Sequence, residues 1–184
     1  MRNSIRSQVS ERDARQLQLI EEVLTLADDL GVELWLRGGW AVDFFLGHIT
    51  RRHQDIDFFV WAKDASRMVQ TLRLHGYEEA VSAPKEQQRD FRKCREDLSF
   101  ALIDRDADGQ VVVAGGPWAG VAWPTGMIDD DTIGHIGELR CHVISPEAQI
   151  EIKVMMPVWD PGRPRRAKDR QDIELLRSAL GGGN

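Results

Sequence analysis

Apolar residues recur every three or four positions over residues 10–30, which predicts an amphipathic opening helix. Ser10 and Asp13 have the spacing of a capping box at its start, and Gly31 follows as a stop signal. Further helices are predicted over residues 40–46, 65–75, 145–156 and 168–180. The helix over residues 145–156 has the strongest start signal, because Ser145 is followed by Pro146 and an acidic residue.

Short runs of branched and aromatic residues lie between these helices and predict strands. They cover residues 32–36, 55–61, 77–82, two segments within 98–114, and 139–144. The turn Asp106-Ala-Asp-Gly109 divides the pair within 98–114, since Asp and Gly tolerate the positive φ of a tight hairpin. Residues 115–137 follow no assignable pattern, and residues 157–167 form a basic, Pro-rich connector. Helices and strands therefore alternate over residues 10–82, strands alone are predicted from there to residue 144, and two helices follow.

Composition narrows the class of protein. The chain has 184 residues, 42% hydrophobic and 29% charged, which is typical of one globular domain. No apolar run approaches the roughly 18 residues that span a bilayer, and the first ten residues are polar, so we expect a cytoplasmic protein without a membrane partner. The net charge of −6 argues against nucleic acid as a partner and favours a small or cationic one. Cys94 and Cys141 lack metal-ligand spacing, so we expect buried, reduced thiols.

The segment from residue 36 to residue 61 contains the most informative polar residues. Gly38 and Gly39 follow a predicted strand and precede a predicted helix, so the backbone can approach a ligand closely while the helix N-terminus faces it. An anion suits such a position. Arg51, Arg52 and His53 lie a short distance along the chain and can neutralise phosphate oxygens. These residues predict a phosphate-binding cradle.

Asp55 and Asp57 lie two apart on the strand that follows. Their side chains therefore point from one face, about 7 Å apart along the chain, which suits a pair of divalent ions. Asp-x-Asp also occurs at 104/106, 106/108 and 129/131, so the spacing alone decides nothing. Only the pair at 55/57 combines an apolar strand with an upstream double glycine. The alternative role of this pair is a structural cap near a turn.

The chain resembles the polymerase-β-like nucleotidyltransferase superfamily, specifically its small lincosamide and aminoglycoside nucleotidyltransferases with a Gly-Gly-Trp motif. The matching positions are Gly38-Gly39-Trp40, Asp43, Gly47, Arg51, His53 and Asp55-Ile56-Asp57. The resemblance is dense over residues 34–61 and thinner over 95–114 and 145–177. It implies an α/β (α+β) nucleotidyltransferase fold with a mixed sheet flanked by helices. We expect a single domain over 1–180, with a core at 10–114, a C-terminal helical part at 145–180, and a tail at 181–184.

The resemblance also implies the chemistry. Asp55 and Asp57 would hold two Mg²⁺ ions. A nucleoside monophosphate would pass from an NTP to a hydroxyl of a small antibiotic, with release of pyrophosphate. When the NTP is ATP, the transferred group is AMP. Gly38, Gly39, Arg52, His53 and Lys153 are the residues expected to bind the nucleotide, and a surface lysine is the alternative role of Lys153. An acidic residue on a neighbouring strand normally completes such sites.

This chain departs from the family at that third acidic position, where Ser99 stands. A serine lacks both the charge and the basicity of an aspartate. Asp97 shares the face of Ser99 on an extended strand and is the predicted substitute, with a solvated strand end as the alternative. The loss of this carboxylate leaves two other functions open, a catalytically weak binding homologue and a nucleotidyltransferase that modifies another protein.

Three features outside this segment have two interpretations each. The acidic run at 129–131 either attracts a cationic acceptor or forms a solvated loop. Trp118, Trp123 and Trp159 either stack on a base or sugar or simply pack. The basic residues of 163–170 either contact phosphate or form a solvated linker. The oligomeric state is open as well, with a homodimer as one alternative.

Overall fold

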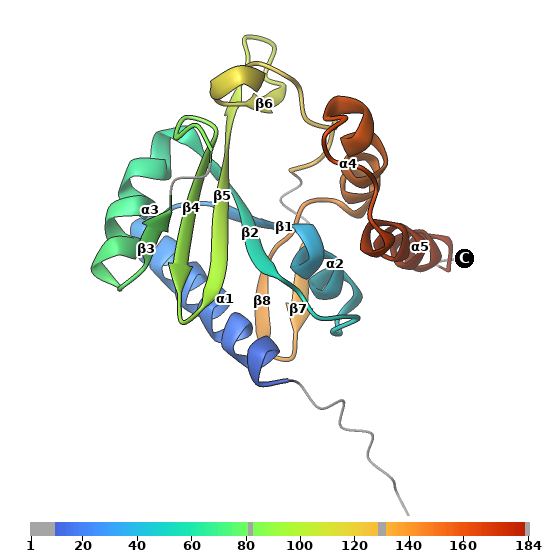
Figure 1. Cartoon of the computed structure of the whole chain (residues 1–184), viewed down its shortest axis with the longest axis horizontal. Coiled ribbons are helices and arrows are strands. Elements are labelled where there is room, and N and C mark those ends of the chain that lie inside the picture. The colour runs from blue at the N-terminus through green and yellow to red at the C-terminus, as the bar shows by residue number, and fades with distance from the viewer. Residues whose placement is uncertain (1–9, 81–82, 129–131, 183–184) are drawn as a thin grey trace, which may run out of the picture.

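The computed structural model describes residues 10–80, 83–128 and 132–182. Helices are α1 Glu11–Leu30, α2 Gly38–Leu46, α3 Ala62–Leu74, α4 Pro146–Trp159 and α5 Ala167–Gly181, with a 3-10 turn at Gly116–Trp118. Strands are β1 Leu34–Arg37, β2 Asp55–Trp61, β3 Glu78–Ala80, β4 Gln88–Lys93, β5 Glu96–Arg105, β6 Val111–Val113, β7 Ile133–Ile136 and β8 Leu139–His142. The predicted mixed α+β fold in a single domain is confirmed (Figure 1).

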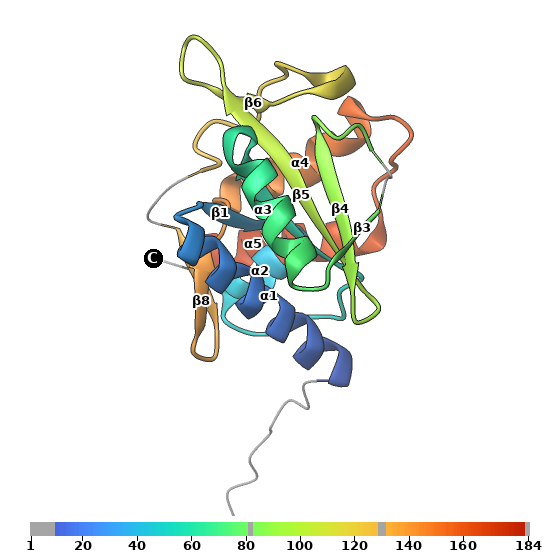
Figure 2. The ribbon, with the colours of Figure 1, turned by 90° about the vertical axis from the view of Figure 1, so that its left-hand side faces the viewer.

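One six-stranded sheet forms the centre of the fold. Its strand order is β1-β2-β5-β4-β3, and β6 pairs with β5. The β2–β5 pair is parallel and the other pairs are antiparallel, so the sheet is mixed. Strands β7 and β8 form a separate hairpin beside α2. Helices α1 and α3 cover one face of the sheet, while α4 and α5 lie on the other side (Figure 2).

Alternation along β2 and β5 divides their side chains between these two faces. Ile56, Phe58 and Val60 are buried beneath α1 and α3, whereas Phe59 is buried on the α4 side. The same period places Asp55 and Asp57 on the α4 side, together with Phe59. The parallel register pairs Asp55 with Asp97 and Asp57 with Ser99, so those β5 residues face α4 too.

A buried carboxylate fixes α1 to the start of β5. Glu96 is 2% exposed and accepts hydrogen bonds of 2.8–3.0 Å from Arg12, Arg15 and Gln16. Burial alone would raise the pKa of Glu96, but these donors lower it below its usual value. Glu96 therefore holds the N-terminal half of α1 against the sheet at the end where the Asp55 strand begins.

Several element boundaries differ from those expected. The two glycines at 38 and 39 form the first turn of α2 rather than a separate turn before it. Helix α4 continues through Pro157 to Trp159, although Pro157 lacks the N–H that would donate to the carbonyl of Lys153. Helix α5 continues to Gly181, one residue into the expected tail. Two strands, β4 and β7, were not predicted, and residues 81–82 of the expected third strand lie outside the described residues.

The cysteine prediction was half right. Cys141 is buried as expected, and burial raises the pKa of its thiol to about 12. Cys94 is exposed instead, because it lies with Arg95 in the two-residue turn between β4 and β5, both at positive φ. The expected turn at residues 106–109 is present, with Asp106 accepting hydrogen bonds from the backbone of Asp108 and Gln110. Over the described residues, no helix is long and apolar enough to cross a membrane.

Candidate active site

The first turn of α2 packs tightly against the segment that carries the predicted metal ligands. Gly38 has φ +71°, and a Cβ there would lie 2.8 Å from Asp57 Oδ2. A Cβ on Gly39 would overlap His53 Nδ1 and lie 2.7 Å from Arg51 Nη2. Both positions therefore require glycine, Gly38 for its backbone conformation and both for the close approach of side chains from residues 51–57.

A buried polar pair fixes this segment to α2. His53 is 2% exposed, and its Nε2 lies 2.5 Å from Asp43 Oδ2. Its ring lies 4.5 Å from that of Trp40, and Thr50 Oγ1 donates to Asp43 Oδ1 at 2.6 Å. The residues of the Gly-Gly-Trp helix thus act as a rigid support for the chain that leads into β2.

Asp55 and Asp57 begin β2 on the α4 face of the sheet. Ser99 Oγ, on the neighbouring strand β5, donates to Asp57 Oδ1 at 2.6 Å. Burial and the negative charge of Asp57 raise the pKa of Asp55, against the opposing effect of Lys168 and Arg166. Two adjacent carboxylates suit a bound divalent cation, which would relieve the repulsion between them.

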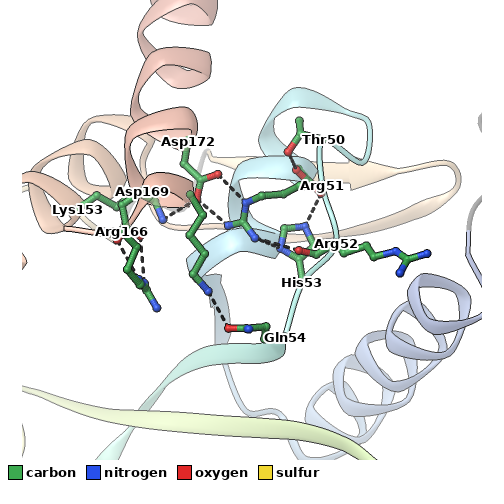
Figure 3. Close-up of polar contacts among 11 residues, drawn as sticks. Thr50, Arg51, Arg52, His53, Gln54, Lys153, Arg166, Asp169 and Asp172 are labelled. Carbon is green, nitrogen blue, oxygen red and sulfur yellow. Dashed lines mark hydrogen bonds and ion pairs between the residues drawn. The ribbon is translucent and has the colours of Figure 1, made fainter. Parts of the chain in front are cut away.

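A second buried carboxylate organises the basic side of the site (Figure 3). Asp172 of α5 accepts from Arg51 Nε at 3.0 Å and from Arg51 Nη2 at 2.8 Å, and its Oδ2 lies 2.9 Å from Lys153 Nζ of α4. Burial would raise the pKa of Asp172, but these two cations lower it. Nearby, Arg166 forms a two-pronged pair with Asp169, and Lys168 Nζ donates to Gln54 Oε1 at 3.1 Å.

These groups surround one cleft of about 610 Å³ between the sheet, α2, α4 and α5. Basic residues outnumber the acidic ones in its lining. The Arg and Lys residues are Arg37, Arg51, Lys153, Arg163, Arg165, Arg166 and Lys168, and the acidic residues are Asp55, Asp57 and Asp169. A cleft with a carboxylate pair, a glycine-lined helix start and an excess of cations can hold a metal-bound polyphosphate.

The structure brings most of the predicted site residues together. Gly38, Gly39, His53, Lys153, Asp55 and Asp57 all line the cleft. Arg52 does not; its side chain is exposed and points away from the cluster, while its neighbour Arg51 faces inward (Figure 3). Asp97 does not line the cleft either, and it forms an exposed ion pair of 2.8 Å with Arg92.

Arg37 also lines the cleft, and sequence reasoning passed over it. Arg37 lies in register with Asp57 across β1 and β2, and its guanidinium lies 4.5 Å from the centroid of the Phe59 ring. Its position next to Gly38 was the signal available in the sequence. Within residues 10–80, 83–128 and 132–182, no cluster of three or more His, Cys, Asp or Glu could by itself hold a metal ion.

Part of this chain is similar in sequence to curated proteins. Curated relatives include a 2''-aminoglycoside nucleotidyltransferase of Klebsiella pneumoniae, 49% identical over 45 residues, and a lincosamide resistance protein of Staphylococcus haemolyticus, 38% identical over 55 residues. These alignments cover 24% and 30% of this chain, and only 25% and 34% of the two relatives. They therefore report on part of each protein.

Solved structures share the fold over most of the chain. ANT(2'')-Ia, in complex with adenylyl-2''-tobramycin, has a TM-score of 0.74 and 24% identity and covers 91% of both chains. The lincosamide antibiotic adenylyltransferase LnuA, bound to lincomycin, has a TM-score of 0.68 and 24% identity and covers 86% of this chain and 94% of its own. The family model described as aminoglycoside-2''-adenylyltransferase matches residues 19–176. The chain thus belongs to the aminoglycoside-2''-adenylyltransferase family.

Proposed function

We propose that this protein transfers AMP from Mg-ATP to a hydroxyl of a small antibiotic and releases pyrophosphate. One observation carries the proposal: Asp55 and Asp57 face the same cleft as the Gly38–Gly39 helix start, in a chain of this family. Transfer of a phosphoryl-type group is catalysed mainly by positioning and by neutralisation of charge. The cleft offers groups for both tasks.

Two carboxylates fit Mg²⁺ here because that ion commonly takes one or two carboxylates and completes its octahedron with phosphates and water. Asp55 and Asp57 would hold the metal, which supplies charge stabilisation on the phosphates when it is bound. The backbone N–H groups at Gly38 and Gly39 would bind phosphate oxygens at the N-terminus of α2. The proposed number of ions is two.

The cations of the cleft have distinct tasks in this proposal. Arg51 and Lys153 are held in place by buried Asp172, so they can neutralise the triphosphate without having to be ordered first. Lys168 and Arg166 lie near Asp55 and would contact the same group. The side chain of Arg52 is exposed. Its role in nucleotide binding stays a prediction from the sequence.

The proton of the attacking hydroxyl needs an acceptor. Ser99 occupies the position where the family resemblance implies an aspartate, and Asp97 stays the prediction made from the sequence for this role. The serine is also the observation that favours the second candidate function, a homologue that binds nucleotide and turns over slowly or not at all. Both candidates require metal-dependent binding of nucleotide, and only the first requires turnover.

Pyrophosphate release separates these functions. The protein is incubated with ATP and Mg²⁺ over a panel of aminoglycosides and lincosamides, with Asp55→Asn as the blank. Acceptor-dependent release that vanishes in the blank supports the transferase. Silence across the panel, together with a Mg²⁺-dependent rise of the melting temperature on addition of ATP, supports the binding homologue. Transfer of label from radiolabelled ATP to a protein band would indicate a protein acceptor instead.

A further inference from the structure

A second hollow of about 260 Å³ opens beside the catalytic cleft. It shares Arg37, Gln88, Met156 and Arg163 with the cleft, so the two lie side by side. Most of its remaining walls are apolar or aromatic. They are formed by Ala101, Leu102, Val113, Trp118, Val121, Ala122, Trp123 and Trp159, together with Gln87 and Asp160.

This hollow exposes large apolar side chains to solvent. Trp118 is 44% exposed and Val121 is 47% exposed. Trp123 packs edge-on against Phe59 at 5.0 Å and against Trp159 at 6.5 Å between ring centroids, which fixes its orientation. Exposed apolar surface rimmed by polar groups is typical of a ligand site, and a fixed indole offers contact area at little entropic cost.

The charges around the hollow do not suit a polycation. Asp160 is the one carboxylate among the lining residues that the structure describes, and its Oδ2 already lies 3.5 Å from Arg163 Nε. Arg37 places a guanidinium over the Trp123 ring, 5.8 Å from its centroid. A ligand with several ammonium groups would meet cations here rather than carboxylates. The acidic run at 129–131, a candidate for attracting cations, lies outside the described residues.

The position of the hollow identifies which substrate it receives. Gly38 and Gly39 follow β1, on one side of Asp57, whereas Ala101 of β5 and Val113 of β6 lie on the other. In a displacement at phosphorus the attacking and leaving oxygens lie roughly in line, on opposite sides of the phosphorus atom. If pyrophosphate leaves on the α2 side, the hydroxyl arrives from the β5 side, where the hollow opens.

We propose that the hollow binds the acceptor, and that the acceptor is a hydroxylated molecule with an extended apolar face and at most one positive charge. This inference rests on the proposed function. One acceptor hydroxyl forms a bond to the α-phosphorus of ATP, the bond from that phosphorus to the bridging oxygen breaks, and pyrophosphate leaves with both electrons. The hydroxyl proton passes to a carboxylate or to solvent.

Equilibrium binding tests this inference without relying on turnover. Calorimetric titrations use the full chain loaded with Mg²⁺ and a non-hydrolysable ATP analogue. Lincomycin, with one amine and an alkyl-substituted ring, represents the proposed class, and tobramycin represents polycations. We expect lincomycin to bind at least tenfold more tightly than tobramycin. Trp118→Ala should weaken lincomycin binding at least tenfold and leave the Kd of the nucleotide unchanged, whereas Leu74→Ala, at an 85% exposed position on α3, should change neither.

Three results would overturn the inference. Tobramycin could bind as tightly as lincomycin, or neither could bind. Alternatively, Trp118→Ala could weaken the binding of nucleotide rather than of acceptor, which would assign the hollow to the adenine base of ATP. The proposed function fails separately, when wild-type protein binds acceptor and nucleotide but releases no pyrophosphate. Val121→Glu gives an independent check, since a new carboxylate at this exposed position should lower the preference for lincomycin over tobramycin.

Strand pairing carries a second inference, about the third carboxylate. The register places Arg37, Asp57, Ser99 and Asp90 in one row across β1, β2, β5 and β4. Side chains in such a row share one face, so Asp90 faces the α4 side beside Ser99. Gln88 Nε2 donates to Asp90 Oδ1 at 2.7 Å, and Gln88 lines both the cleft and the hollow.

We infer that Asp90 supplies the carboxylate that Ser99 lacks, and that it accepts the proton of the acceptor hydroxyl. It lies on the acceptor side of Asp57, on the strand next to the one that carries Ser99. Asp97 lies one step outward along β5, where it is 55% exposed and paired with Arg92. The register places Asp90 one strand spacing, about 4.8 Å, beyond Ser99, and its hydrogen bond to Gln88 connects it to the lining of the cleft and the hollow.

Rescue tests this assignment. Asp90→Asn should lower kcat at least 100-fold, within the 10²–10⁴ range of a general base. The calorimetric Kd of Mg-ATP should change less than threefold. Adding Ser99→Asp to Asp90→Asn should raise kcat at least tenfold above that of Asp90→Asn alone. The assignment is overturned by a loss of less than tenfold, by failure of the rescue, or by a larger loss in Asp97→Asn.

Discussion

Substitution of Asp172 by asparagine tests how the basic side of the cleft is held. Asp172 is fully buried, and its two oxygens contact Arg51 at 2.8 and 3.0 Å and Lys153 at 2.9 Å. Asparagine preserves the shape of the side chain but leaves two nearly buried cations without their counter-charge. Breaking a buried ion pair on one side typically costs about 3–5 kcal/mol.

The structure places the expected loss at the lower end of that range. The side chains of Arg51 and Lys153 remain 15% and 11% exposed, so water can partly replace the lost carboxylate. We therefore expect a loss of about 3 kcal/mol in the free energy of unfolding. A domain of this size changes its melting temperature by about 2–4 °C per kcal/mol, which gives a decrease of roughly 6–12 °C.

Urea unfolding followed by tryptophan fluorescence measures this loss, and calorimetry gives the melting temperature. Asp64→Asn is the matched control, because Asp64 makes a 3.4 Å pair with Arg67, whose side chain is 52% exposed. Such a pair contributes about 0–1 kcal/mol. A loss below about 1 kcal/mol in Asp172→Asn, or equal losses in both variants, would refute the idea that a buried counter-charge holds the cleft cations.

Three further predictions concern the cradle, the pH dependence and the thiols. Gly39→Ala should raise the Kd of Mg-ATP at least tenfold in calorimetry, because its Cβ would displace His53; an unchanged Kd would mean that the glycine is not required by contact. The pKa of Glu96 is lower in the folded protein than the value of about 4.5 in the unfolded chain, so Glu96 stabilises the fold above pH 4.5. This stability is lost as the pH falls through the folded pKa. Glu96→Gln should therefore flatten the decrease of the melting temperature between pH 5 and 3. A thiol reagent at pH 8 should label Cys94 quickly and Cys141 only after unfolding; fast labelling of both would contradict the burial of Cys141.

The sequence predicted those parts of the fold that local signals determine. The capping box at Ser10, the stop at Gly31 and the hairpin turn at Asp106 are all present, because each depends on residues close together in the chain. The 55/57 carboxylate pair was also predicted correctly on one face of a strand. Strand β4 was missed, since its charged pattern is typical of a loop and its pairing with β5 is a tertiary effect.

The candidate site was predictable only as far as its residues are close in the chain. Gly38, Gly39 and Asp55 lie within one segment of dense resemblance, and the structure brings them to one cleft. Asp172 lies 121 positions from Arg51, so no sequence spacing could identify their contact. Asp90 escaped notice for the same reason, because its place beside Ser99 follows from strand register alone.

Metal-dependent nucleotide binding by carboxylate variants tests most directly whether this cleft is a nucleotidyltransferase site. ATP is titrated calorimetrically into wild-type protein, Asp55→Asn and Asp57→Asn, each with Mg²⁺ and with EDTA. Asp104→Asn is the control, since Asp104 lies on the far end of β5 and lines neither the cleft nor the hollow. We expect Mg²⁺ to tighten ATP binding at least tenfold in the wild type and the control, and not in Asp55→Asn or Asp57→Asn. Equal Mg²⁺ dependence in all four proteins would contradict the assignment of Asp55 and Asp57 as the metal ligands.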